Sequence, residues 1–335
     1  MEILIRQDRT SYDSAEKRNV VLNNYVSQCV HNISGEQISV DISTLVQNLR
    51  ERADWYTGLI RTQEWVTDEN GNGWFNGYYD NHGRPVEGKR DNHVRMMLTG
   101  QVFAIMSGTA GEEQIKAVCK SADRYLFDKK AGGYRLNTDF KEEKFDLGRM
   151  FGFAYGEKEN GAVFSHMAVM YANALYQRGF VSEGHKVLQT LLDAAMNFEN
   201  SKMYPGLPEY FDNDGRGLYA YLTGAASWYM LTMITEVFGV KGKLGDLVIA
   251  PSLLPEQFDE KGDAGLQLEF AGKKFHIILH NPKKQSSRDG QIRQAVCDDQ
   301  IILETEPEYG VRLSKKVIET LDSGKCHRID VVLSE

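Results

Sequence analysis

The chain has 335 residues, of which 39 are basic and 47 acidic, and 41% of its residues are hydrophobic. This composition is typical of a soluble globular protein, and it excludes a disordered or collagen-like chain. The formal charge of −8 gives no general attraction to nucleic-acid phosphates, so we expect no nucleic-acid partner.

The cysteines are scattered along the chain and form no C-x-x-C motif: Cys29, Cys119, Cys297 and Cys326. In a chain of this length they are typical of free thiols in a reducing compartment, so we expect no disulfide and no structural zinc. The first residues, MEILIRQDRT, lack the apolar core of a signal peptide, and no uncharged apolar stretch of about 18 residues follows. These features predict a cytoplasmic protein with no membrane partner.

The first predicted element is a helix over 41–65, where apolar residues recur every three to four positions. Further helical patterns cover 92–107, 112–126, 161–179, 181–198 and 223–238. We expect a capping box from Thr109 to Glu112 and a helix stop at Gly239. Long Gly- and aromatic-rich loops are predicted between the helices, at 66–91, 128–160 and 199–222. Loops of that length usually carry function.

After Gly245 apolar and polar residues alternate around turn residues such as Gly272, which is the pattern of antiparallel strands. The sequence therefore predicts a mainly α protein with a β domain: helices over 32–244, a β-sandwich domain over 245–335, and an unassigned segment over 1–31. Helices joined by long loops and closed by a sandwich describe an α/α toroid with a β cap. The predicted helices are few for a complete toroid, which favours part of one.

Residues 68–73 match the first six positions of a calcium-binding EF-hand loop. The twelfth position requires a bidentate Glu, but it is Tyr79. A hairpin turn before Trp74 is the interpretation that we favour.

Asp80 follows a run of aromatic residues, GWFNGYYD. Rings that exclude water can raise the pKa of a carboxyl group, as a general acid requires near neutral pH. An ordinary Asp-Asn turn explains the same residues equally simply.

Two predicted helix starts are suited to an anion. His166 would lie near one of them, where free N–H groups and the helix dipole favour negative charge. At the other, Thr223 is a natural N-cap and Gly224 leaves room for a ligand to approach. A hydrogen-bonded core histidine and a plain capped helix are the alternatives. A site that binds phosphate and protonates a leaving group would combine both helix starts with Asp80.

Several segments, in order along the chain, resemble signatures of one enzyme family: GWFNGYYDNHGRPVEG, VRMMLTGQVFAIMSG, GGYRLNTDF, YGEKENGAVFSH, GLPEYFDNDGRG and YLTGAASWY. They are similar to glycoside hydrolase family 94, the inverting disaccharide and oligosaccharide phosphorylases, and most similar to its cellodextrin phosphorylase branch. The resemblance extends from about Asn32 to the end. It implies the second half of an (α/α)6 barrel, followed by a C-terminal antiparallel β-sandwich domain.

The resemblance implies a glycosyltransferase that uses inorganic phosphate to cleave β-1,4-gluco-oligosaccharides, releasing α-glucose 1-phosphate. Asp80 would be the general acid, and because phosphate replaces water and base, no second catalytic carboxylate is required. Phosphate would be bound by His166, Thr223 and Gly224. The sugar would be contacted by four residues: Lys158, Glu159, Trp74 and Tyr210. Lys158 and Glu159 could equally form a solvated ion pair. No metal or organic cofactor is implied.

The family's phosphate-binding Arg lies in the first half of the barrel, which has no counterpart in this sequence. We therefore expect weak or absent turnover by this chain alone, and either a homodimer or the missing N-terminal half as a partner. Three alternatives remain open. They are a phosphorylase of β-1,2- or β-1,3-glucans, an inverting glycosidase with Glu209 or Asp212 as base, and a non-catalytic carbohydrate-binding remnant.

Overall fold

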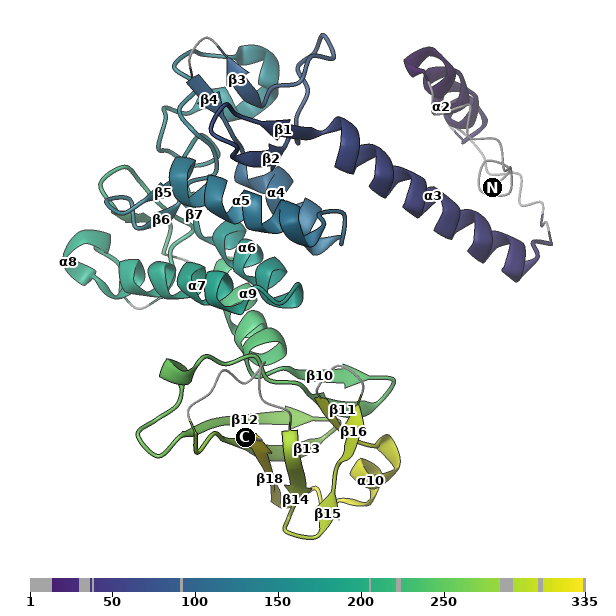
Figure 1. Ribbon diagram of the computed structural model, residues 1–335, viewed down its shortest axis with the longest axis vertical. Coiled ribbons are helices and arrows are strands. Elements are labelled where there is room, and N and C mark those ends of the chain that lie inside the picture. Colours follow the sequence, from purple (N-terminus) through teal and green to yellow (C-terminus); the bar gives the residue numbers. More distant parts are fainter. Residues whose placement is uncertain are drawn as a thin grey trace. The chain divides into compact units, whose positions relative to one another are not determined.

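The computed structural model describes residues 14–29, 37, 39–90, 93–204, 206–220, 224–283, 292–306 and 310–333. The chain divides into two units, Met1–Glu64 and Trp65–Glu335. In the first unit lie α2 (Ala15–Cys29) and α3 (Ile42–Gln63), which Figure 1 draws in purple and dark blue. The side chain of Asp41 accepts the N–H of Thr44 at 2.8 Å, which caps α3. The helix predicted over 41–65 is thus confirmed.

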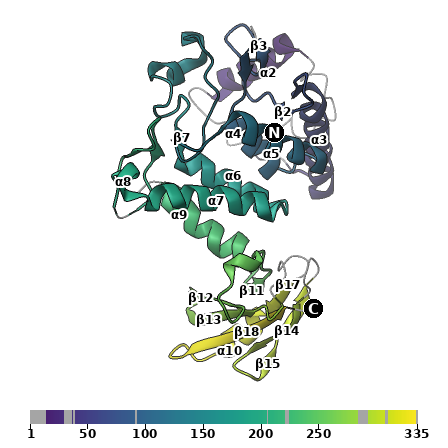
Figure 2. The ribbon, with the colours of Figure 1, turned by 60° about the vertical axis from the view of Figure 1, so that its left-hand side comes forward.

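The second unit contains α6 (Ser165–Gln177) and these further helices: α4 (Leu98–Met106), α5 (Glu112–Tyr125), α7 (Val181–Met196), α8 (Phe198–Ser201) and α9 (Gly224–Thr232). Helix α6 packs against α4, α7 and α9, and α7 and α9 lie alongside it in Figures 1 and 2. Its buried residues occur on all sides and include Ala168, Ala172 and Ala174, whose small side chains let the neighbouring helices approach closely. The helices predicted around 112–126, 161–179 and 181–198 are confirmed.

Three details differ from the sequence expectations. Helix α4 begins at Leu98, because 93–95 form a strand. The cap of α5 is Gly111, whose N–H donates to Oε1 of Gln114 at 3.1 Å, whereas the Thr109 hydroxyl bonds Ser107; the predicted capping box is therefore wrong. Helix α9 continues into a π-helix, Met233–Val237, before Gly239 ends it as predicted, with a φ of +67°.

The predicted loops contain short strands, which pair as hairpins and one three-stranded sheet: β1 (Trp65–Thr67) with β2 (Gly73–Phe75), β3 (Gly88–Arg90) with β4 (His93–Arg95), β5 (Phe127–Asp128) with β6 (Gly133–Tyr134), and β7 (Val163–Phe164), β8 (Tyr210–Phe211) and β9 (Gly217–Leu218). A 3-10 helix spans Phe145–Gly152. Asp68 accepts the N–H groups of Asn70 and Asn72 at 2.8 and 2.9 Å, so the hairpin turn before Trp74 is confirmed. The described residues contain no group of three potential metal-binding side chains.

The strands after the helices form two sheets. The first holds β10 (Val240–Lys243), β11 (Asp246–Ile249), β17 (Gly310–Leu313) and β16 (Glu304–Glu306) in that order; the second holds β12 (Asp263–Phe270), β13 (Lys273–His280), β18 (Cys326–Leu333), β14 (Ile292–Cys297) and β15 (Ile301–Ile302). Every pair is antiparallel except β13–β18. Short helical turns lie at Pro255–Gln257 and at α10 (Lys315–Thr320). Strands after the helices are confirmed, whereas the half-barrel, the sandwich and the domain limits stay predictions.

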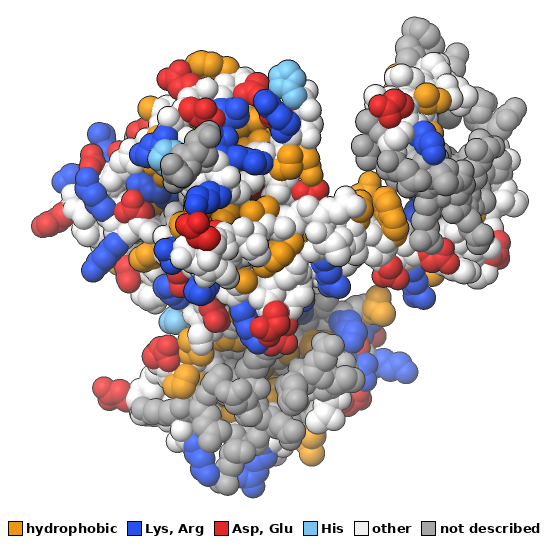
Figure 3. Space-filling view, turned by 45° about the horizontal axis from the view of Figure 1, so that its top comes forward, with side chains coloured by type: hydrophobic (Ala, Val, Ile, Leu, Met, Phe, Trp, Pro, Cys, Tyr) orange, Lys and Arg blue, Asp and Glu red, His pale blue; other side chains and the backbone are white. Residues whose placement is uncertain are grey.

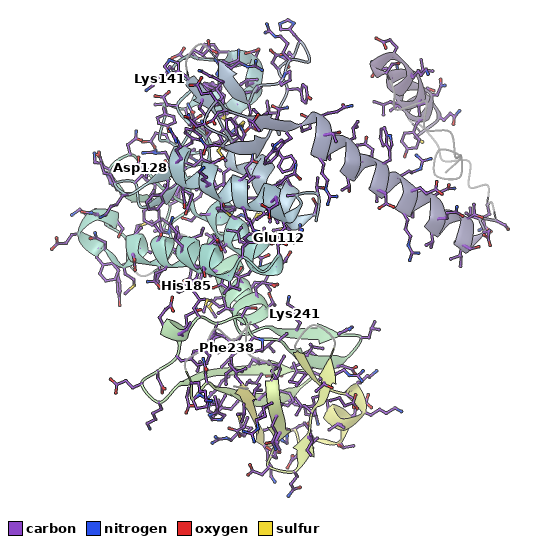
Figure 4. All side chains as sticks on the ribbon, in the orientation of Figure 1. Glu112, Asp128, Lys141, His185, Phe238 and Lys241 are labelled. Carbon is purple, nitrogen blue, oxygen red and sulfur yellow. The ribbon has the colours of Figure 1, made fainter. Side chains whose placement is uncertain are left out.

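The cysteines are free thiols; Cys119 and Cys297 are buried, and Cys29 and Cys326 are exposed. No helix in the described part of the chain combines the length and apolarity needed to cross a bilayer. Figure 4 shows how the helices lead into the sheets, with Phe238 and Lys241 on either side of Gly239. Gly239 is required there, since an added Cβ would lie 1.8 Å from the carbonyl oxygen of Ala250.

In the second sheet, His280 lies between Asp263 and Asp330, with its two ring nitrogens 2.8 and 2.7 Å from their carboxylates. Burial alone would lower the pKa of His280, but the hydrogen bonds and charges of the two carboxylates outweigh it and raise the pKa. A folded-state pKa above the unfolded value means that the stabilisation is complete below the usual histidine value of about 6.5. It is lost as pH rises through the folded-state pKa.

We therefore predict that the free energy of unfolding falls as pH rises above about 6.5, the usual pKa of histidine, and that His280→Gln removes most of this fall. Urea unfolding at a series of pH values measures it. His276→Gln is the matched control, because His276 lies on the same strand and forms no ion pair among the described residues. Parallel pH profiles for wild type and His280→Gln would contradict the prediction.

Candidate active site

A tight loop presents Lys158 and Glu159. The side chain of Asn160 donates to the carbonyl of Phe153 at 2.8 Å, and the Gly156 N–H donates to the Asn160 carbonyl at 2.6 Å. Lys158 takes a φ of +44°, a left-handed conformation that a residue with a side chain rarely adopts. The loop is therefore held in one shape by its own hydrogen bonds.

Arg135 anchors this loop to the hairpin beneath it. Its guanidinium donates to the carbonyl oxygen of Gly161 at 2.6 Å and to Oδ2 of Asp128 at 2.8 Å. Asp128, labelled in Figure 4, lies on β5. The N–H groups of Lys130 and Ala131 donate to Asp128 and hold its carboxylate against Arg135. The loop therefore rests on a buried guanidinium that is fixed by a charge-assisted hydrogen bond.

The charges of Lys158 and Glu159 have separate partners. The Lys158 ammonium lies 4.1 Å from the centroid of the Tyr219 ring, and the contact with Tyr219 raises the pKa of Lys158. Glu159 pairs with Arg149 at 3.1 Å, but its Oε2 is buried without a hydrogen-bond partner. The two residues thus do not form the solvated ion pair with each other that was the alternative to a sugar contact.

Tyr210 lies on β8, opposite Phe164 on β7, and the two rings stack with their centroids 6.3 Å apart. Its hydroxyl donates to Oε2 of Glu157 at 2.9 Å, and burial together with this carboxylate raises the pKa of Tyr210. Tyr219 follows with its centroid 6.0 Å from that of Tyr210. An aromatic wall therefore stands beside Lys158.

His166 and Gly224 are brought together, as the sequence predicted for a phosphate site. His166 lies in the first turn of α6, and its ring packs against Gly224, the first residue of α9, so closely that an added Cβ would lie 2.7 Å from Nδ1. Burial lowers the pKa of His166, which keeps the imidazole neutral, and within the described ranges its Nε2 has no hydrogen-bond partner. Thr223 lies outside the described residues.

Buried polar atoms without a hydrogen-bond partner are concentrated here. Among the described residues, four such atoms belong to this region: Glu159 Oε2, Ser165 Oγ, His166 Nε2 and Glu209 Oε2. An unpaired buried polar group costs about 1–3 kcal/mol, so these atoms are positioned to bind a polar ligand that restores the missing hydrogen bonds. We call these four residues, with Lys158 and Gly224, the polar cluster.

Sequence reasoning missed Ser165 and gave Glu209 only an alternative role. The two residues flank a pair of strands: Ser165 directly follows β7, Glu209 directly precedes β8, and the Ser165 N–H donates to the Glu209 carbonyl at 2.9 Å. These strands are two residues long and far apart in the sequence, so no local pattern could have paired them. Asp212, the other candidate base, closes its own turn by accepting the N–H groups of Asp214 and Arg216.

The Trp74 side chain is not accessible to a sugar. Its side chain is fully buried, and it packs edge-to-face on Tyr125 with centroids 5.8 Å apart. This packing is that of a core residue, and it counts against the predicted contact between Trp74 and sugar.

Asp80 is committed to its own turn. Its Oδ1 accepts the N–H groups of Arg84 and His82 at 3.0 and 2.8 Å, and its Oδ2 accepts Nε of Arg84 at 2.7 Å. Hydrogen bonding from the Arg84 backbone, followed by the Arg84 side chain and the His82 backbone, lowers the pKa of Asp80 to about 2. The expectation that neighbouring rings raise this pKa is wrong, because direct hydrogen bonds to the carboxylate outweigh the apolar surroundings.

Asp80 also lines a cavity whose lining includes no residue of the polar cluster. A general acid must lie within hydrogen-bond reach of the leaving oxygen. The catalytic role of Asp80 stays a prediction, and both its carboxylate contacts and its position favour the alternative of an Asp-Asn turn.

The sequence profile of the Glycosyl hydrolase 94 superfamily, catalytic domain, matches residues 34–239. Cellobionic acid phosphorylase of Neurospora crassa is 25% identical over 60% of this chain and 27% of its own length. Solabiose phosphorylase of Paenibacillus borealis is 24% identical over 82% of this chain and 35% of its own length. The chain thus spans about a third or less of these relatives.

Among solved structures, the GH63 mannosylglycerate hydrolase of Thermus thermophilus matches with a TM-score of 0.33 and 17% identity, over 56% of this chain and 37% of that one. A TM-score this low supports no inference about the site. The sequence profile covers more than half of the chain, and it spans the polar cluster from Lys158 to Gly224. The chain therefore belongs to the glycosyl hydrolase 94 superfamily.

Proposed function

We propose that this chain forms the donor-sugar and phosphate side of an inverting glycoside phosphorylase. The observation that carries the proposal is the polar cluster, in which buried carboxylate, hydroxyl and imidazole atoms lack partners within a family member. Lys158 and Glu159, with Tyr210 behind them, would bind the hydroxyl groups of one glucosyl unit. His166, the N–H at Gly224 and Thr223 would bind phosphate.

In the proposed reaction an oxygen of phosphate attacks the anomeric carbon from the face opposite the glycosidic oxygen. The bond between that carbon and the glycosidic oxygen breaks, and the oxygen leaves with a proton from a general acid. Inversion converts a β-glucoside into α-glucose 1-phosphate and a shortened saccharide. A neutral His166 suits this role, because it donates a hydrogen bond to phosphate while an additional buried charge is avoided.

The proposed substrates are β-1,4-gluco-oligosaccharides, with β-1,2- and β-1,3-linked glucans as runners-up. The relatives include a cellobionic acid phosphorylase and a solabiose phosphorylase, so the family accommodates varied acceptors. A cytoplasmic location, where phosphate is available, is part of the proposal. A second polypeptide or a second copy of this chain as partner is also part of the proposal.

The test incubates the purified chain with cellotetraose and inorganic phosphate and assays glucose 1-phosphate. Product that depends on phosphate supports a phosphorylase. Bound cellotetraose without any product would instead indicate a carbohydrate-binding remnant, and free glucose without phosphate would indicate a glycosidase.

For Asp80→Asn we predict a structural effect. Asparagine keeps an oxygen for the two backbone N–H groups but loses the ion pair with Arg84, whose side chain is 66% exposed. We expect a melting temperature lower by a few degrees at most and phosphorolysis within about threefold of wild type. Loss of a general acid would instead lower the rate about 10²- to 10⁴-fold. A loss of that size at an unchanged melting temperature would show that Asp80 is the general acid.

Gly224→Ala tests the phosphate position. The new Cβ would lie 2.7 Å from the His166 ring and displace it, so we predict that phosphate binds at least about tenfold more weakly, as measured by calorimetric titration. Gly58→Ala on α3 is the control, because a Cβ there meets no atom within 4 Å. Equal phosphate affinity in wild type and Gly224→Ala would refute the assignment.

Glu209→Gln separates the phosphorylase from an inverting glycosidase. Of the two candidate bases, Glu209 and Asp212, Glu209 is the better one, since its Oε2 has no hydrogen-bond partner among the described residues. If it activates water, the neutral amide abolishes release of free glucose. If the protein is a phosphorylase, we predict that removing a negative charge near His166 preserves or increases glucose 1-phosphate formation. Loss of phosphate-dependent product in a folded Glu209→Gln variant would contradict this prediction.

A further inference from the structure

A second cavity, of about 480 Å³, lies between α7 and α9, which both pack against α6. Its apolar lining comes from Leu188 and Leu192 on α7, and from Tyr229 and Met233 on α9 and the π-helix that continues it. A spacing of four residues places each pair on one side of its helix. π-helices are rare and often lie at functional sites, and this one begins at Met233 on the cavity wall. The cavity shares no residue with the polar cluster or with the cavity that Asp80 lines.

A buried hydroxyl group without a partner lies beside this cavity. Tyr176, in the last turn of α6, is 4% exposed, and its ring packs against Gly184 of α7, where an added Cβ would lie 2.6 Å from it. Burial, followed by the lining residues Tyr229 and Glu256, raises the pKa of Tyr176. The Gln257 amide acts in the opposite direction, but among the described residues no group completes a hydrogen bond with the hydroxyl. The hydroxyl therefore faces the lining residues with its hydrogen-bonding capacity unused.

The polar lining adds acceptor oxygens. Gln189 donates its side-chain N–H to Asp193 at 2.7 Å, so its carbonyl oxygen Oε1 is left to accept a donor from a ligand. Oε1 of Glu256 lies 4.0 Å from Nε2 of His185, too far for a hydrogen bond. Figure 4 labels His185 on the side of α7 that faces the strands. A ligand that enters here meets a carboxylate and an amide oxygen above the Tyr176 hydroxyl.

The charge around this cavity is negative. On the face shown in Figure 3, basic and acidic side chains are interspersed, whereas no Lys or Arg is among the described residues that line the cavity. The ionisable groups of the lining are Glu256, His185 and Tyr229. Burial and then the Asp193 carboxylate raise the pKa of Tyr229, so a second negative charge acts on the cavity from α7. An anion is disfavoured here, and the face of the Tyr229 ring adds an attraction for a cation.

We propose that this cavity binds a small organic amine, that is, a primary ammonium group on an apolar body. An ammonium group has three N–H donors and no acceptor, which matches the Glu256 carboxylate, Oε1 of Gln189 and the Tyr176 hydroxyl oxygen. The apolar body would lie against the leucines of α7 and Met233. The cavity volume is within the range of small-molecule sites. Because the cavity is separate from the polar cluster, this binding does not depend on the proposed function.

The experiment titrates the full chain calorimetrically with benzylamine, benzyl alcohol and benzoate, near neutral pH and in a buffer free of amines. The three probes have the same ring and nearly the same size but differ in charge, so they separate the ammonium group from the apolar body. We expect benzylamine to bind at least about tenfold more tightly than benzyl alcohol, and benzoate to bind most weakly.

Glu256→Gln should weaken benzylamine binding about tenfold and leave benzyl alcohol unchanged, because only the charge of the rim carboxylate is removed. Tyr176→Phe should weaken benzylamine several-fold without lowering the melting temperature, since the hydroxyl has no partner to lose in the described part of the free protein. Glu260→Gln is the matched control, because Glu260 is exposed nearby in the sequence and does not line the cavity.

Melting curves establish that each variant is folded. The proposal is overturned if benzylamine binds no better than benzyl alcohol. It is also overturned if Glu256→Gln and Tyr176→Phe bind benzylamine as tightly as Glu260→Gln does, because the amine then binds elsewhere on the chain.

Discussion

The position of the polar cluster depends on the burial of α6 from all sides. A helix that packs against α4, α7 and α9 at once cannot rotate without opening several interfaces, and its alanines leave little space for adjustment. Its first turn therefore holds Ser165 and His166 at a fixed place. Because α9 is one of the packed neighbours, Gly224 at its start is fixed against His166 by the same contacts.

The two charged regions of the second unit use carboxylates in opposite ways. In the polar cluster, Glu159 and Glu209 each retain a buried oxygen without a partner, a state that is unfavourable unless a ligand binds. Around the cavity that Asp80 lines, the carboxylates are paired instead: Asp80 with Arg84, Glu142 with Arg95, and both Glu142 and Asp146 lie within 4.0 Å of the Lys144 ammonium. The first arrangement suits the neutral hydroxyl groups of a ligand, whereas the charges of the second are balanced within the chain.

Features that depend on local periodicity were predictable from the sequence, whereas those that depend on distant pairing were not. Helix α3 and the strands after Gly245 follow from the spacing of apolar residues, whereas β10, at Val240–Lys243, precedes the predicted start of the strands. The hairpins within the predicted loops have strands of two or three residues, too short for alternation to show. For Asp80, the aromatic run was visible in the sequence, but the N–H groups that lower its pKa come from a turn geometry that composition does not reveal. That His166 and Gly224 share one site was predicted from two helix starts suited to an anion, and the family resemblance implied the same site.

The backbone conformation of Lys158 lowers the stability of its loop, whereas its side chain supplies a charge to the site. A left-handed φ of +44° suits glycine, and a residue with a side chain held there costs on the order of 1 kcal/mol. A chain optimised for stability alone would have glycine at this position. The lysine at this position places an ammonium 4.1 Å from the centroid of the Tyr219 ring, which glycine could not do. Replacing Lys158 with glycine is therefore expected to stabilise the loop and to remove the charge beside Tyr219. At this residue a more stable fold and an intact site exclude each other.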